Sequence, residues 1–270
     1  MAHLVEMPNH RRNIMVMNEK STIGRTLEGP SVVPSKTFFS EKNDGLSVAL
    51  DYSSGEFRLA LALDGAVVAD ARAALQIRRF AASIDILREA FESVGAEFAD
   101  AKRWTCGTGP GGFTALRASA ALVMGLAFQG SVDGSVAARG VPSVAAIGME
   151  VSRARPDAES AAVLYDAKGG GVLRCALERR DGALSPRLDT GFAAKVAGLD
   201  DLEPFDAVVA LSAEREALEK ALPGLDGALW IERFPVADLL DAPGYPWGAG
   251  LEEPLYLRPS TDAKPYAWRK

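Results

Sequence analysis

The sequence predicts an α/β protein with two domains. A length of 270 residues suits two modest domains, because single domains typically hold about 100 to 200 residues. Residues 46–63 and residues 161–178 contain the same unit, a strand pattern ending in aspartate, a turn and a second strand. Helical patterns alternate with further strand patterns after each unit, which indicates an α/β fold. The repetition suggests a duplicated fold.

The composition excludes several classes of protein. Apolar residues make up 48% of the chain and charged residues 24%, as in soluble globular proteins. The net charge of -6 argues against unaided binding to nucleic acid, which needs a positive surface. Two cysteines, Cys106 and Cys175, favour a reducing compartment over a disulfide framework. No apolar stretch approaches the roughly 20 residues of a membrane span, and residues 1–20 lack a secretory signal. We therefore expect a cytoplasmic protein without membrane contact.

The chain divides into three parts. Residues 1–44 show no sustained period and collect Pro8, Pro30 and Pro34, which predicts a poorly ordered N-terminal extension. Organised sequence begins at Gly45, so we assign residues 45–150 to an N-terminal lobe. Residues 151–270 form a C-terminal lobe with a proline-interrupted tail that should lie extended on the surface.

The N-terminal lobe begins with a predicted meander of strands. Residues 46–50 and 57–63 alternate between apolar and other side chains, and Asp64-Gly65 is a two-residue hairpin signal before a third strand. Residues 51–55, which read DYSSG, are typical of a turn. Asp51 and Ser53 in this turn either form an Asx-type turn that closes the hairpin or take part in a ligand site.

Residues 73–94 are predicted to form an amphipathic helix. Its apolar positions step by 4, 3, 4 and 3 residues through Phe80, Ile84, Leu87, Phe91 and Val94. A second stripe at Ile77, Ala81 and Ala90 widens the apolar surface. The periodicity is compatible with burial inside the chain and with a helix that also meets a partner.

A glycine-rich loop follows the next predicted strand. The remaining pattern predicts strands at 103–106, 141–147, 161–165, 172–178 and 207–211, helices at 113–128 and 213–222, and a polar insert at 131–139. The loop, residues 107–112, fits two phosphate-binding templates poorly. Phe113 stands where a Walker loop has lysine. Gly107, Gly109 and Gly112 satisfy a dinucleotide fingerprint, but Pro110 removes a backbone donor.

Residues 109–117, which read GPGGFTALR, closely resemble the GPGSFTGLR signature of the TsaB (YeaZ) family. Further matching pieces follow in order around it: Asp51 and Ser53, Val141-Pro142, Asp166-Ala167-Lys168, and PLYLRP at residues 254–259. The sequence departs from the family at Gly112, usually serine, and at Ala115, usually glycine. Loss of a capping hydroxyl to glycine should cost only a few tenths of a kcal/mol.

The resemblance implies two ribonuclease-H-like lobes of the actin-like ATPase (ASKHA) superfold. It also implies a cytoplasmic, non-catalytic subunit that dimerises with its paralogue TsaD. With the ATPase TsaE, that complex adds threonylcarbamoyl to the adenosine beside the anticodon of tRNA. The chain would meet tRNA only through the complex, and a homodimer is the alternative assembly without TsaD. Because such ATPases hold phosphate and metal at the position of Asp51 and Ser53, these residues are a candidate remnant of a nucleotide site.

The family interface is built largely from the two helices of the N-terminal lobe. Mapped onto this sequence, it predicts an interface formed by Ile77, Phe80, Ile84, Leu87, Phe91, Phe113, Leu116, Arg117, Ala121 and Met124. We expect no cofactor for this chain alone, and ATP with Mg²⁺ only in the complex.

The distribution of histidine argues against catalysis. His3 and His10 both lie in the predicted extension, so the folded part has no histidine for a metal pair, a general base or a nucleophilic triad. We therefore predict no catalytic or metal-binding residue. Two alternatives remain open: an ATP-binding or peptidase-like enzyme of the same superfold using Asp51 and Asp166 around a divalent ion, and a drifted paralogue with another partner.

Overall fold

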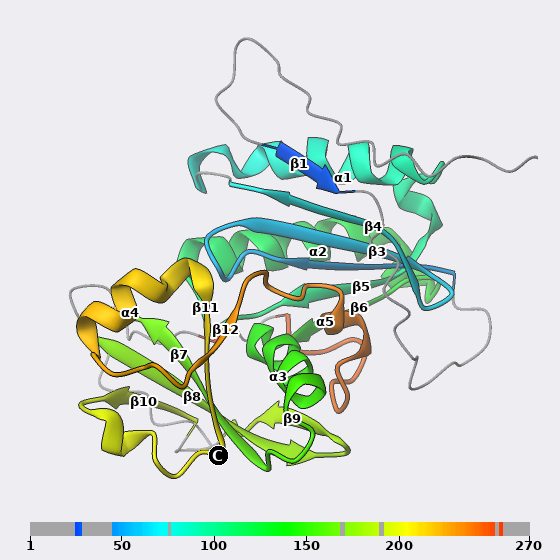
Figure 1. Ribbon diagram of the computed structural model, residues 1–270. Helices are drawn as coiled ribbons and strands as arrows, with labels where there is room; N and C mark the ends of the chain where they lie inside the picture. The colour runs from blue at the N-terminus through cyan, green and yellow to red at the C-terminus, as the bar shows by residue number, and fades with distance from the viewer. Residues whose placement is uncertain are drawn as a thin grey trace, which may run out of the picture.

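Two β-sheets with helices between and around them make up the computed structural model (Figure 1). The structure describes residues 25–28, 45–74, 77–167, 171–188, 192–251 and 254–255. Within these ranges, no helix combines the length and apolar character that a membrane span requires.

The first sheet has the strand order β1-β4-β3-β2-β5-β6. Its strands are β1 Arg25–Glu28, β2 Leu46–Asp51, β3 Phe57–Leu63, β4 Ala66–Ala73, β5 Ala101–Gly107 and β6 Ala137–Val141. Strands β2, β3 and β4 form an antiparallel meander, whereas β5 runs parallel to β2 and β6 parallel to β5. Parallel neighbours need long crossovers, which α1 (Ser83–Ser93) and α2 (Phe113–Asp133) supply.

The second sheet repeats this arrangement with the order β10-β8-β7-β11-β12, and β9 pairs with β8. Its strands are β7 Ser160–Asp166, β8 Val172–Arg180, β9 Ala183–Pro186, β10 Ala193–Val196, β11 Ala207–Leu211 and β12 Leu229–Ile231. Strand β7 is antiparallel to β8 and parallel to β11, as β2 is to β3 and β5. The structure thus shows the duplication that the sequence predicts.

Three apolar clusters hold these layers together. The first packs α1 and α2 against the outer face of the first sheet, around Trp104, Phe57 and Phe91. A second cluster joins Ala49 and Ala60 of the first sheet to α3 (Ser143–Ala154) and to the second sheet. The third packs α4 (Arg215–Ala221) on the far face of the second sheet. Figure 1 accordingly places α3 and the short helix α5 (Asp238–Asp241) between the two sheets.

The structure corrects several predicted elements. Residues 143–154 form α3 rather than a strand over 141–147, because a continuous apolar run does not distinguish a strand from a fully buried helix. The predicted insert at 131–139 is instead the last turn of α2 and most of β6. The helix predicted from residue 73 begins later, because β4 runs to Ala73. Short 3₁₀ helices lie at Ile77–Ala82, Phe98–Asp100, Leu199–Asp201 and Ser212–Glu214.

Part of the predicted N-terminal extension also has regular structure. Arg25–Glu28 pairs antiparallel with β4 at the edge of the first sheet. The sequence did not predict this strand, because residues 1–44 show no sustained hydrophobic period. The remaining residues of that segment lie outside the described ranges, as do residues 256–270 of the tail.

Candidate functional site

Asp51 ends β2 and is completely buried. Its Oδ1 accepts hydrogen bonds from the backbone N–H of Ser53 at 2.8 Å and from the Ser53 hydroxyl at 2.7 Å. Its Oδ2 accepts a hydrogen bond from the hydroxyl of Ser143, the first residue of α3. The structure thus brings together the predicted pair Asp51 and Ser53, and it adds Ser143. Sequence reasoning missed Ser143 because it placed that residue in a strand, although Pro142 before it is a helix-start signal.

The glycine-rich loop closes over this carboxylate. A Cβ at Gly107 would lie 1.9 Å from Asp51 Oδ2, and one at Gly111 would lie 2.7 Å from the Cα of Ser53. The N–H of Gly109 donates to Ser143 Oγ at 2.9 Å. Because the glycines bring the loop backbone directly against the turn, the loop packs on protein groups at these positions.

The charge of Asp51 is poorly solvated in this position. Burial raises the pKa of the Asp51 carboxyl, while the hydrogen bonds from Ser143 and Ser53 and the charge of Arg58 oppose the increase. Arg58 is the cross-strand partner of Asp51 on β3 and is itself buried. Its guanidinium pairs with Glu56 at 2.5 Å.

These residues do not fit a magnesium ion with a phosphate group. Mg²⁺ demands near-octahedral oxygen coordination and keeps several waters, whereas both oxygens of Asp51 are occupied by hydroxyl and amide donors in a solvent-free position. Asp166, at the matching end of β7, has a backbone N–H that donates to Glu214 at 2.9 Å. Among the described residues, no three His, Cys, Asp or Glu side chains gather as metal ligands.

The raised pKa of Asp51 predicts a specific pH dependence of stability. Because the folded protein keeps this proton at pH values where the unfolded chain has lost it, the contribution of Asp51 to the free energy of unfolding should fall as pH rises above about 4. The Asp51→Asn variant lacks this titration. Its stability relative to the parent should therefore increase with pH, by at most about 1.4 kcal/mol per pH unit. Urea denaturation of both proteins at several pH values measures this difference, and parallel curves would contradict the raised pKa.

One face of α2 carries large apolar side chains into solvent. Phe113, Met124, Phe128 and Val132 are 52%, 54%, 67% and 71% exposed. Arg117 and Ala121 are also exposed, and the Arg117 guanidinium lies 4.3 Å from the centroid of the Phe113 ring. Successive members are three or four residues apart, which places their side chains on one side of a helix. We call this set, Phe113, Arg117, Ala121, Met124, Phe128 and Val132, the α2 stripe.

Several residues predicted for the interface lie elsewhere. Leu87, Phe91 and Leu116 are fully buried in the described chain, where they fill the interior of the first lobe, so their assignment to a surface is corrected. Phe80 is half-buried and its ring stacks on that of Tyr52 at 5.6 Å. Ile84 is half-buried, and the side chain of Ile77 lies outside the described part.

Phe128 and Val132 belong to the exposed face but were not predicted for it. Because α2 is rich in apolar residues on all sides, its sequence period does not show which side meets the sheet. Phe128 and Val132 follow Met124 at intervals of four residues, so extending the predicted interface along this spacing would have included both.

No family model and no curated protein matches the sequence at a significant level. Among solved structures, the chain is similar to YeaZ from Pseudomonas aeruginosa, with a TM-score of 0.57 and 21% identity over 73% of this chain and 89% of that one. It is equally similar to an uncharacterized protein described as having similarity to peptidase YEAZ from Pseudomonas aeruginosa. That match has a TM-score of 0.57 and 21% identity, and it covers 79% and 99% of the two chains. The chain therefore has the fold of the YeaZ structures, and its two sheets of matching strand order agree with the two-lobed α/β fold that the sequence predicts.

Proposed function

We propose that this chain is a TsaB-type, non-catalytic subunit whose α2 stripe binds a TsaD-like paralogue. In this proposal the TsaD-like chain carries out threonylcarbamoyl transfer to the adenosine beside the anticodon of tRNA, and a TsaE-like ATPase supplies the nucleotide chemistry. The YeaZ fold and the GPGGFTALR segment at residues 109–117 support the family assignment.

The α2 stripe is the observation that carries the proposal. Monomeric soluble proteins rarely expose large contiguous apolar patches, and such patches mark interaction sites. Aromatic residues, methionine and arginine are the side chains enriched in protein interfaces, and the stripe contains Phe113, Met124, Phe128 and Arg117. A partner with an apolar helix face of similar length would complement this surface.

The interior of the lobes supports a non-catalytic role. The Asp51 carboxylate is closed off by Ser53, Ser143 and the glycine-rich loop. Cys106 and Cys175 are fully buried, and burial raises the pKa of both thiols. Because the thiolate is the reactive form of cysteine, neither side chain is suited to act as a nucleophile.

Co-expression tests the proposal. When the chain is produced with a TsaD-like paralogue from the same cell, we expect the two proteins to co-elute as one complex in size-exclusion chromatography. If the paralogue elutes separately while this chain is folded, the proposed partner is wrong.

Calorimetry separates the proposal from a nucleotide-binding enzyme of the same superfold. We expect no stoichiometric binding of Mg-ATP to the isolated chain, because the Asp51 position is filled by protein groups. Clear binding that Asp51→Asn weakens would favour the enzyme instead.

A further inference from the structure

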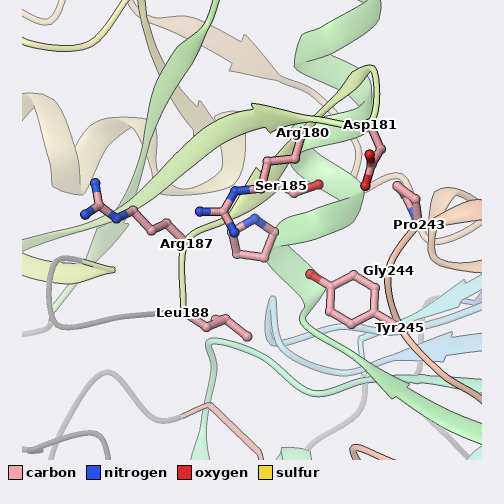
Figure 2. Close-up of a pocket in the computed structure, with 9 residues that line it drawn as sticks. Arg180, Asp181, Ser185, Arg187, Leu188, Pro243, Gly244 and Tyr245 are labelled. Carbon is pink, nitrogen blue, oxygen red and sulfur yellow. The ribbon is translucent and has the colours of Figure 1, made fainter. Parts of the chain in front are cut away.

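A pocket lies between the β8–β9 hairpin and the chain segment that follows α5 (Figure 2). Its volume is about 510 Å³, within the range of sites for small organic ligands. The hairpin contributes Arg180, Ser185 and Arg187 to the wall, and the later segment contributes Pro243 and Tyr245. The pocket is far in sequence from Asp51 and from the α2 stripe.

The polar groups of the pocket face one another across the two segments. Figure 2 shows the Arg180 guanidinium and the Tyr245 hydroxyl on the two sides of the same space. Burial raises the pKa of Tyr245 to about 12, although the charges of Arg180 and Arg139 oppose the increase. The tyrosine therefore remains a neutral hydroxyl near neutral pH and can donate a hydrogen bond to an anion.

A carboxylate on β8 bridges the two arginines. Glu178 accepts hydrogen bonds from Arg187 at 2.6 Å and from Arg180 at 3.3 Å, one on each oxygen. A guanidinium has five N–H donors, so a single bond to Glu178 leaves donors on Arg180 for a ligand. Asp181, exposed at the hairpin turn, also lines the pocket, which restricts an anionic group to the arginine side.

The remaining wall is largely apolar. Pro186, Pro243, Leu188 and the Tyr245 ring surround the space beside the arginines. The backbone carbonyl of Tyr245 accepts a hydrogen bond from Arg139 of β6 at 2.9 Å, which fixes this side of the pocket to the first sheet.

We propose that this pocket binds a small organic anion, with its phosphate or carboxylate on Arg180 and the Tyr245 hydroxyl and its apolar body against the two prolines. Arginine pairs with both kinds of anion through parallel hydrogen bonds. The site does not depend on the proposed partner, so the isolated full-length chain is sufficient to test it.

Calorimetry with phenyl phosphate as the probe tests the site, with benzoate as the carboxylate counterpart and both at constant ionic strength. We expect binding of at least one of them with a dissociation constant of about 1 mM or below. Inorganic phosphate should bind more weakly because it lacks the apolar body, and neutral benzyl alcohol should not bind. Absence of binding by both organic anions at about 10 mM would overturn the proposal.

Variants locate the binding. Arg180→Gln removes the charge and should weaken binding by about tenfold or more, and Tyr245→Phe should weaken it by about threefold or more. Arg88→Gln on α1, another exposed arginine, is the matched control and should bind as the parent does. Thermal unfolding shows whether each variant is folded. Equal binding by the parent and a folded Arg180→Gln variant would show that the anion binds elsewhere and would overturn the assignment.

Discussion

Replacement of Arg139 by methionine is expected to lower the free energy of unfolding by about 3 kcal/mol or more. Arg139 lies in β6 and is only 6% exposed. Its two terminal nitrogens donate to four backbone carbonyls of the segment that contains α5: Leu239 at 3.1 Å, Leu240 at 2.6 Å, Ala242 at 3.5 Å and Tyr245 at 2.9 Å.

The size of the effect follows from these carbonyls. The last carbonyls of a helix have no partner within the helix, and Arg139 supplies partners to Leu239 and Leu240 of α5. A methionine of similar length leaves both carbonyls without these donors, at about 1 to 3 kcal/mol for an acceptor that is buried, as the Leu239 contact is. The variant also loses the stacking of Arg139 on Trp247, whose ring centroid is 4.4 Å away.

Lysine should not rescue this position, because an ammonium group cannot reproduce the planar set of donors. Urea denaturation of the full-length chain measures the effect. Arg88→Met on the exposed face of α1 is the control and should change stability by less than about 0.5 kcal/mol. If Arg139→Met is as stable as that control, Arg139 does not hold the α5 segment.

The Phe128→Asp variant is expected to lose at least about 100-fold in affinity for the TsaD-like paralogue while remaining folded. Phe128 lies between Met124 and Val132 on the α2 stripe and is 67% exposed. In a complex that covers the stripe, the aspartate would bury an unpaired charge in an apolar interface. In the isolated protein the carboxylate stays in water, so the cost is limited to helix propensity, about 0.7 kcal/mol or less.

Leu63→Asp provides the matched control for this variant. Leu63 ends β3 at the hairpin and is 48% exposed, so the substitution makes the same kind of change outside the stripe. Its affinity for the paralogue should equal that of the parent. Equal affinities for Phe128→Asp and Leu63→Asp, measured by titration calorimetry, would mean that the stripe is not the binding surface.

Local signals were sufficient to predict the meander and the loop. Alternating residues with Asp64-Gly65 between them predicted the β3–β4 hairpin, and the structure shows that hairpin with Leu63 paired with Ala66 across the turn. The GPGGFTALR segment predicted the family fold. Turns, and the positions that require glycine, depend on residues that are neighbours in the sequence. They can therefore be recognised from one sequence.

The features that the sequence did not predict depend on contacts between residues that are far apart in the chain. Arg139 fell in a predicted polar insert, because its carbonyl partners come about 100 residues later in the chain. Leu87 and Leu116 looked like interface residues because an apolar stripe does not show what covers it, and the structure places both inside the first lobe. Asp51 and Ser53 were recognised as a pair, but the closure over them by Ser143 depends on α3, which the sequence pattern did not reveal.

Site-specific photo-cross-linking tests the proposed role of the α2 stripe most directly. A photoreactive amino acid at position 128 should give a covalent adduct with the TsaD-like paralogue when the two proteins are mixed, because Phe128 is in the exposed stripe. The same amino acid at position 63 should give none. An adduct only between two copies of this chain, or equal adducts from both positions, would contradict a partner subunit that binds through α2.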